Sequence, residues 1–518
     1  MATNSWRVPR ILGKAALGTA AVGAALFGGV YWNYKDLHGH PRLVWEGINR
    51  YRRFAICSMK LIYIYKNPFS RLSIEEKHSW AGKVLNATLR KNSGTSIKLG
   101  QVLAMMDVLL PEEFTDELTS LFQQAPQSKF DDIRAEIESQ LGRKFEDIFA
   151  TFNEKPIASG SIAQVYEATL KENGKRVAVK VRHASLREAM EFDLAVMRFF
   201  VEFGSWVDKD FNYRWLSDDA SENLRKELNF KNEMHNILKI TNLMKGARRL
   251  VFPTVLPEYC GEGVLTMEFI DGYSITNVKR LNEDKIPLDV IAETMAESFA
   301  KMIFDLGFVH ADPHPGNIFV QKNGPKDFNL VLLDNGLYAE LSDQTRINYA
   351  KMWRGIITRN EELLKESTNN LGVGFAFKLF TAMITNQTYD QTVNGTESDI
   401  KQRLKGSSPA EEKRRQNSQL AKRWRKEILE CLEKMNRDMI LLFKINNYIE
   451  SIDTKLGQPI NNYWYTAKYA FGNYIENNNV GWWQSTWIRL ELLNVLLWLK
   501  IYECGLSMKV KNDQSTTN

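Results

Sequence analysis

Cysteine is scarce in this 518-residue sequence, and its scarcity excludes two common architectures. The four cysteines are scattered along the chain, at positions 57, 260, 431 and 504. They are too few for a disulfide scaffold, and their spacing does not fit a zinc ribbon. Extremes of composition are also missing, since apolar residues make up 44% and charged residues 25% of the chain. This balance excludes wholesale disorder, collagen-like repeats and a polytopic membrane protein, and the length predicts about three domains.

Acidic residues are absent from the first 35 positions, where four basic residues give a local charge of +4. Residues 401–426 form the other basic region, with ten Lys or Arg against two Glu, which gives +8. The whole chain carries +6, so the residues outside these two regions sum to −6. The basic character is therefore regional, which argues against a protein that coats nucleic acid. We expect no nucleic-acid partner.

An uncharged run of 18 residues, Ala15 to Trp32, follows the basic N-terminus. As a helix the run would span about 27 Å, close to the bilayer core of about 30 Å. A basic, acid-free N-terminus is typical of a mitochondrial address. An anchor in another membrane and a cleaved secretory signal are the alternatives, and Lys14 argues against the signal. We expect residues 1–35 to be a mitochondrial address and membrane anchor.

The charges around this run also predict an orientation. Arg7, Arg10 and Lys14 precede it, and positive residues tend to stay on the non-translocated side, which in the mitochondrial inner membrane is the matrix. We therefore expect the rest of the chain in the intermembrane space. There the basic segment 401–426 would attract anionic lipids, although a solvated helix face or loop is the alternative. Membrane lipids are an expected partner.

Between Ser73 and Phe152, apolar residues recur at three- and four-residue spacing, which predicts helices. Residues 36–145 are accordingly assigned to a helical extension. This extension contains the string Lys98-Leu99-Gly100-Gln101. Taken alone, such a string indicates only a solvated turn, and its meaning depends on the motifs that follow.

The motifs begin with a loop of small residues that runs into a predicted strand. The loop reads Ala158-Ser159-Gly160-Ser161-Ile162-Ala163-Gln164-Val165. A second strand, Val177 to Val181, follows a turn at Asn173-Gly174 and carries Lys180. A small-residue hairpin followed by Val-Ala-x-Lys is the arrangement that covers nucleotide phosphates in protein kinases. Alone, the same pattern is typical of an ordinary hairpin with a surface lysine.

Two stronger motifs follow. The first is the run His310-Ala311-Asp312-Pro313-His314-Pro315-Gly316-Asn317. It places the Asp312 carboxylate at an attacking nucleophile and the Asn317 amide at a magnesium ion. The second is a strand, Leu330 to Leu333, that ends in Asp334 and so offers Mg²⁺ another hard oxygen ligand. In this order the two motifs predict a nucleotide- and magnesium-dependent site.

A weaker signal lies between the hairpin and these motifs. The buried-type strand Leu265 to Gly272 occupies the place of a kinase hinge, where backbone groups bind adenine. This position makes Glu268 and Ile270 further nucleotide-binding candidates. No Ala-Pro-Glu follows Asp334, so the shelf that holds a peptide substrate in typical protein kinases is not expected.

Together, these residues resemble the AarF/UbiB family of atypical kinases. The resemblance runs from about Lys91 to Lys351 and rests on Lys-x-Gly-Gln, the Ala/Ser-type loop, Glu-x-Asx-(x)3-Glu at 227–233, and the His-Ala-Asp-Pro-His-Pro-Gly-Asn run. Gln-Ala-Pro-Gln at 124–127, the polar residue after Asp334 and the N-terminal segment are similar to a mitochondrial subgroup of that family.

The resemblance implies a role for each matched residue. Residues 158–165 and Lys180 contact the nucleotide, and Lys180 pairs with Glu233. Asn317 and Asp334 hold Mg²⁺, while Asp312 is the catalytic carboxylate.

It also implies that Lys98 and Gln101 lie over the active site, with Lys98 near Glu227, and restrict the access of bulky substrates. Three positions depart from the family pattern. Asn229 stands where Asp is expected and Asn335 where Phe is usual, while Gly160 replaces an alanine and lets the backbone approach phosphates more closely.

The C-terminal third gives less information. Residues 398–426 are polar and basic, and helical patterns then continue to about Met508. The region from Trp482 through Trp487 to Leu499 is very apolar, yet Arg489 and Glu491 argue against a membrane span. It is expected to pack on the core or, alternatively, to lie against a membrane surface.

The expected fold is α+β, a two-lobed protein-kinase-like fold with an N-terminal helical extension and a helical C-terminal region. Residues 146–400 are expected to form the nucleotide-binding domain, and residues 401–518 the basic segment and C-terminal helices. The expected cofactors are ATP or ADP with Mg²⁺. The resemblance implies an ATPase or a phosphotransferase for a small molecule or lipid that regulates mitochondrial lipid or quinone homeostasis and membrane organisation. A nucleotide-sensing scaffold without turnover is the alternative.

Overall fold

The computed structural model describes residues 41–67, 70–104, 110–122, 127–183, 214–324, 327–385, 435–457, 460, 462–477 and 481–497, with single positions at 186, 190, 191, 193, 194, 198 and 202. The expected anchor at 15–32 and the basic segment at 401–426 lie outside these residues. In the part described, no helix is long and apolar enough to cross a membrane. The chain forms two compact units, one of Met1–Asn232 with Val255–Phe269, the other of Glu233–Thr254 with Ile270–Asn518.

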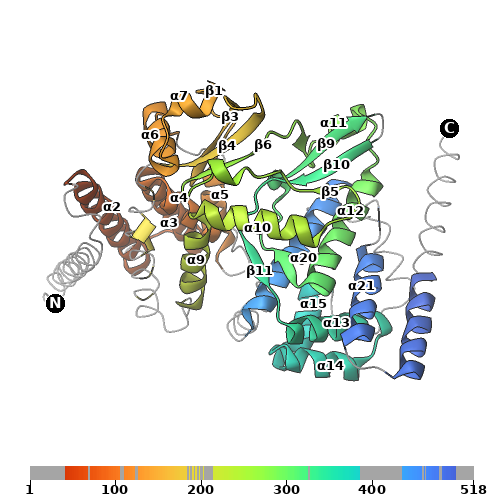
Figure 1. Cartoon of the computed structure of the whole chain (residues 1–518). Helices are drawn as coiled ribbons and strands as arrows, with labels where there is room; N and C mark the ends of the chain where they lie inside the picture. The colour runs from red at the N-terminus through yellow and green to blue at the C-terminus, as the bar shows by residue number, and fades with distance from the viewer. Residues whose placement is uncertain are drawn as a thin grey trace, which may run out of the picture. The chain divides into compact units, whose positions relative to one another are not determined.

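Helices make up the N-terminal part of the first unit, as the spacing of apolar residues predicts. They are α2 (Pro41–Lys66), α3 (Ile74–Asn92), α4 (Thr95–Ala104), α5 (Glu112–Thr119), α6 (Phe130–Leu141) and α7 (Phe145–Ile148). A capping box starts α3, because Ser73 Oγ accepts from the Glu76 amide while the Ser73 amide donates to Glu76. In Figure 1, α3, α4 and α5 lie together, and they share a core that includes Leu89, Leu118 and Leu121.

An antiparallel sheet forms the other part of the first unit, and its strands have the order β1-β3-β4-β6, with β2 paired to β3. The strands are β1 (Phe149–Phe152), β2 (Ala158–Ser159), β3 (Ala163–Leu170), β4 (Arg176–Arg182) and β6 (Val264–Glu268). Successive side chains of a strand point to opposite faces of the sheet, and on one face Val177, Val179 and Val181 of β4 are buried with Tyr166. The helix expected up to Phe152 is wrong at its end, since residues 149–152 pair with β3 instead.

Two other local expectations also need correction. By sequence pattern, residues 227–233 fit a single helix, yet α9 (Arg214–Glu227) ends and α10 (Phe230–Leu243) begins within them. The break is stabilised because Asn229 Oδ1 accepts from the Lys231 amide and the Phe230 amide donates to Glu262. Residues 98–101 are not a turn, since they lie inside α4. In both segments, tertiary packing rather than the local sequence pattern determines the secondary structure.

The second unit contains two small sheets. One has the order β5-β10-β9-β7, and the other pairs β11 with β8. The strands are β5 (Leu250–Val251), β7 (Tyr273–Ser274), β8 (Phe308–His310), β9 (Ile318–Gly324), β10 (Asp327–Leu332) and β11 (Tyr338–Glu340). The β10 strand overlaps the expected strand from Leu330 to Leu333. By sequence pattern, residues 337–340 run almost directly into a helix, and a helix does begin at Asp343; the short strand β11 that precedes it has no sequence signal.

Helices form the rest of the second unit. They are α11 (Val278–Glu283), α12 (Leu288–Ala300), α13 (Asp343–Thr358), α14 (Glu361–Asn370), α15 (Phe377–Thr385), α20 (Arg437–Lys455) and α21 (Asn462–Asn477), followed by helical residues 482–497. Figure 1 shows α13 beside α14 and α21. The short helix η5 (Pro315–Asn317) joins β8 to β9. The expected α+β class and the helical C-terminal region are therefore confirmed.

Candidate active site

The small-residue loop is a tight hairpin between β2 and β3. Ala158 pairs with Val165 and Ser159 with Gln164, and the Gly160 amide donates to the Ala163 carbonyl at 2.8 Å. The buried Gln164 carboxamide accepts from the Ser128 amide at 2.9 Å, so this side chain anchors the preceding segment. A Cβ built on Gly160 would meet only Ala163 O, at 3.6 Å. The hairpin itself does not require glycine there, and the closer approach of a phosphate that glycine would allow stays a prediction.

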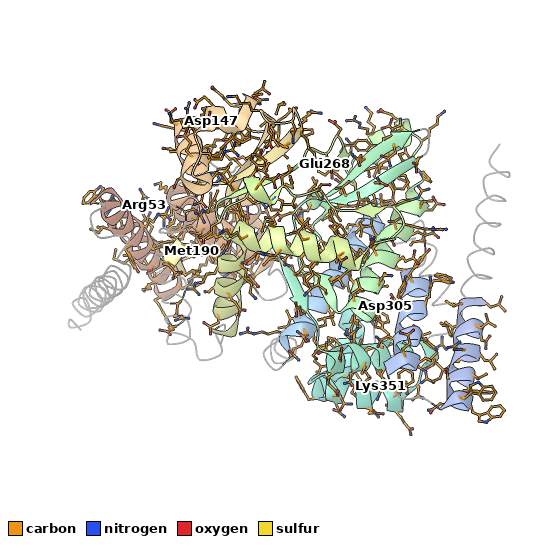
Figure 2. All side chains as sticks on the ribbon, viewed as in Figure 1. Arg53, Asp147, Met190, Glu268, Asp305 and Lys351 are labelled. Carbon is orange, nitrogen blue, oxygen red and sulfur yellow. The ribbon has the colours of Figure 1, made fainter. Side chains whose placement is uncertain are left out.

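Lys180 lies in β4, in register with Val165 of the hairpin and with Leu265 of β6. Its ammonium lies 5.2 Å from the centre of the Phe230 ring, a cation–π geometry that the sequence did not suggest. Glu268, labelled in Figure 2, is the last residue of β6, the strand next to β4. Lys180 and Glu233 belong to different units, so their pairing stays a prediction. Glu268 and Ile270 also belong to different units, so their joint role in nucleotide binding stays a prediction.

The Lys-x-Gly-Gln residues lie in α4 and contact different neighbouring segments. The Lys98 ammonium lies 2.9 Å from Glu227 Oε2 at the end of α9, the proximity that the resemblance implies. Gln101 Nε2 donates to the Leu121 carbonyl at 3.1 Å and so holds α4 to the neighbouring chain. A methyl group at Gly100 would overlap the ends of Leu121 and Leu89, which must shift to accommodate it. Glycine therefore permits the close packing that positions Lys98.

A buried ion pair supports the N-terminal end of α4. Arg50 Nη1 donates to both carboxylate oxygens of Asp193, at 3.0 and 2.9 Å, and Thr95 at the start of α4 also donates to Asp193. Burial raises the pKa of Asp193, while the Arg50 charge and the hydroxyl donors act in the opposite direction. These contacts connect α2, α4 and residue 193. No sequence pattern indicates this pair, because its members are 143 positions apart.

His310 connects the two catalytic motifs in the second unit. Its Nδ1 accepts from the Asp312 amide at 3.2 Å, so the proton is on Nε2, which donates to the Asp334 carbonyl at 2.6 Å. Burial lowers the pKa of His310, which keeps this tautomer neutral. One imidazole therefore bridges the backbone of the expected catalytic carboxylate and that of the expected metal ligand.

The expected metal ligands lie at adjoining chain segments. Asn317 ends η5, and its carbonyl accepts from the Leu333 amide at 2.8 Å, one residue before Asp334. Amide and carboxylate oxygens are the ligands that Mg²⁺ prefers. The described residues contain no group of three or more His, Cys, Asp or Glu that would hold a metal ion by themselves. The donor set thus fits an ion that takes its other ligands from phosphates and water.

Asn335 replaces the usual Phe and forms a buried polar network in this structure. Its Nδ2 donates to the Leu332 carbonyl at 3.0 Å, and its Oδ1 accepts from the Tyr338 hydroxyl at 2.8 Å. Its amide donates to Glu233 Oε1 at 3.3 Å, and its carbonyl accepts from Asn236 at 3.0 Å. Hydrogen bonds to α10 therefore fix the Asp-Asn-Gly turn at the position where the family pattern has Phe.

The α20 helix supplies two groups that no sequence motif indicates. Lys444 Nζ lies 3.2 Å from Asp312 Oδ1. One turn later, burial and a hydrogen bond to the charged Asp312 raise the pKa of the Tyr448 hydroxyl. No local sequence motif indicates Lys444 and Tyr448, because both lie far along the chain from the catalytic run.

The chain is similar to known proteins. A family model described as the ABC1 atypical kinase-like domain matches residues 120–368. The chain is 34% identical to mouse AarF domain-containing protein kinase 1 over 71% of this chain and 68% of the mouse protein. It is 30% identical to Drosophila melanogaster AarF domain-containing kinase 1 over 86% of each chain.

A solved structure of the Rv3197–erythromycin complex from Mycobacterium tuberculosis is 26% identical, over 57% of this chain and 73% of that one, with a TM-score of 0.42. The family match covers Lys180, Asp312, Asn317 and Asp334, while Lys98 lies before it and Lys444 after it. The family has a kinase-like fold, which implies the use of a nucleotide and a metal in general. By its motifs and its relatives, the chain belongs to the ABC1/AarF family of atypical kinases.

Proposed function

We propose that this chain binds ATP with Mg²⁺ and acts as a phosphotransferase or an ATPase. The observation that carries the proposal is the bridge at His310, which ties the Asp312 and Asp334 backbones together. The bridge keeps a carboxylate for the nucleophile close to a carboxylate for the metal, as phosphoryl transfer requires.

Each residue would contribute positioning or charge. Asp312 would orient the attacking hydroxyl or water and accept its proton. Asp334 and Asn317 would hold Mg²⁺, which supplies positive charge to the phosphate oxygens. Lys180 would neutralise the inner phosphates beneath the hairpin at Gly160. ADP would bind through the same groups, without the terminal phosphate.

A small molecule or a lipid is the substrate class that we propose, within mitochondrial lipid or quinone homeostasis. After Asp334, the chain forms β11 and enters α13 at Asp343. The structure describes every residue of this short connection, which leaves little length for a peptide-binding segment. The ion pair of Lys98 with Glu227 further supports a restricted approach, as the family resemblance implies.

The test of this proposal is ATP consumption by the purified chain. Because the carboxylates at positions 312 and 334 are both present, we expect turnover that requires Mg²⁺ and stops on its removal with a chelator. Nucleotide binding without any turnover would instead favour the sensing scaffold. Absence of both binding and turnover would reject both functions.

We further propose that the chain is held at the mitochondrial inner membrane with the kinase-like domain in the intermembrane space. The acid-free N-terminus and the run at 15–32 support this location. Lipid contact is supported by helical residues 482–497. They pack on the core as expected, through the buried Ile488 and the ion pair of Glu491 with Arg354, but they also expose an apolar face. Trp482, Trp483 and Trp487 are 70%, 79% and 70% exposed, and Trp favours the membrane interface. The same face exposes Leu490, Leu493 and Leu497.

Protease treatment of mitoplasts tests the location. With the outer membrane ruptured, added protease should digest the C-terminal region, because the proposed orientation exposes it. A resident matrix protein serves as the protected control. Protection of the C-terminal region under these conditions would contradict the orientation.

A further inference from the structure

The catalytic carboxylate is contacted by a helix that lies outside the family match. Lys444 and Tyr448 come from α20, whereas the matched residues end at 368. The Lys444 ammonium lies 3.2 Å from Asp312 Oδ1 and 5.6 Å from the centre of the Tyr448 ring. The Tyr448 ring in turn contacts His314, at 6.1 Å between ring centres. Side chains from the catalytic run and from α20 therefore pack together.

A cation beside Asp312 offsets negative charge around the catalytic segment. Asp312, Asp334 and Glu233 give this unit three carboxylates around the catalytic segment, and the terminal phosphate of a nucleotide would bring further negative charge beside Asp312. His314 does not supply the compensation, because its Nδ1 accepts from the Gly316 amide at 3.1 Å and the ring is then neutral. Lys444 is a cation paired with Asp312.

We propose that Lys444 is a phosphate-binding residue that holds the terminal phosphate of the nucleotide next to Asp312. This inference rests on the proposed function. An ammonium has three N–H donors, and the Lys444 side chain is 42% exposed, so it can serve Asp312 and an incoming phosphate together. Such a contact is charge-assisted and thus among the stronger hydrogen bonds. α20 is accordingly a functional part of the site.

The proposal predicts a selective loss of ATP affinity. In the full chain with Mg²⁺, Lys444→Met should weaken ATP binding about tenfold, while ADP, which lacks that phosphate, should bind within about twofold of its normal affinity. Lys444→Arg keeps the charge and should recover most of the loss. Lys455→Met is the matched control, because Lys455 is an exposed lysine of the same helix. Isothermal titration with ATP and with ADP gives both affinities.

The outcomes separate this inference from the function on which it rests. If the wild-type chain binds Mg-ATP and Lys444→Met binds it equally well, Lys444 has no phosphate contact and only the inference is wrong. Tighter ATP binding or faster turnover in Lys444→Met would mean that Lys444 blocks the site, which also overturns it. An equal loss for ATP and ADP would indicate a general structural effect and would reject the terminal-phosphate contact. If the wild-type chain binds no nucleotide, the proposed function and the inference both fail.

Discussion

Replacing Asp312 with Asn should lower magnesium-dependent ATP consumption at least about 100-fold, the usual range for loss of a general base. Nucleotide affinity should change little, because Asp312 is not one of the expected metal ligands. The asparagine keeps the backbone amide that donates to His310, so the bridge to Asp334 stays in place. Single-turnover measurements, together with ATP titration, separate the chemical step from binding.

Asp327→Asn provides the matched control for this change. Asp327 is an exposed carboxylate at the start of β10, in the same unit. Its replacement should leave both turnover and affinity unchanged. A rate for Asp312→Asn within about threefold of the wild type would remove Asp312 from the catalytic role.

The second large effect concerns stability. Asp193→Ala should destabilise the first unit by about 3–5 kcal/mol, because it leaves the buried Arg50 guanidinium without its carboxylate. Thr95 also loses its acceptor at the start of α4. Hydrogen exchange of the α2 and α4 amides reports on this local stability, which a single whole-chain melting transition would not isolate.

Two further variants make the interpretation specific. Lys83→Ala removes an exposed partner of Glu117 in the same unit and should cost less than about 1 kcal/mol. The double variant Arg50→Met, Asp193→Leu replaces both charges with apolar groups and should recover much of the lost stability. An Asp193→Ala chain with unchanged exchange in α4 would show that this pair does not support the helix that carries Lys98.

Local motifs in the sequence were sufficient to predict the central strands and the candidate chemistry. The small-residue hairpin, the strand with Lys180 and the strand before Asp334 were all expected and are present. Such elements are predictable because turn residues and alternating apolar residues encode them over short distances. The roles of Lys180, Asp312, Asn317 and Asp334 stay predictions, since they need a ligand to be tested.

Long-range contacts were not predictable from the same patterns. β1 and β11 are short strands whose formation depends on pairing with β3 and β8. The ion pair of Arg50 with Asp193 and the contact of Lys444 with Asp312 join residues more than 100 positions apart. Asn335 departs from the family pattern, in which Phe is usual, and four hydrogen bonds satisfy its side chain and backbone. Only the folded chain shows which partners these polar groups find.

Titration of the full chain with ATP, in the presence and absence of Mg²⁺, tests the central claim most directly. Binding should require the metal and should raise the unfolding free energy by about 2.7 kcal/mol at 100 times the dissociation constant. Asp334→Ala should abolish the effect by removing a metal ligand, while His314→Ala should retain much of it. Nucleotide binding that is unchanged in Asp334→Ala, or absent from the wild-type chain at saturating Mg-ATP and Mg-ADP, would contradict the account.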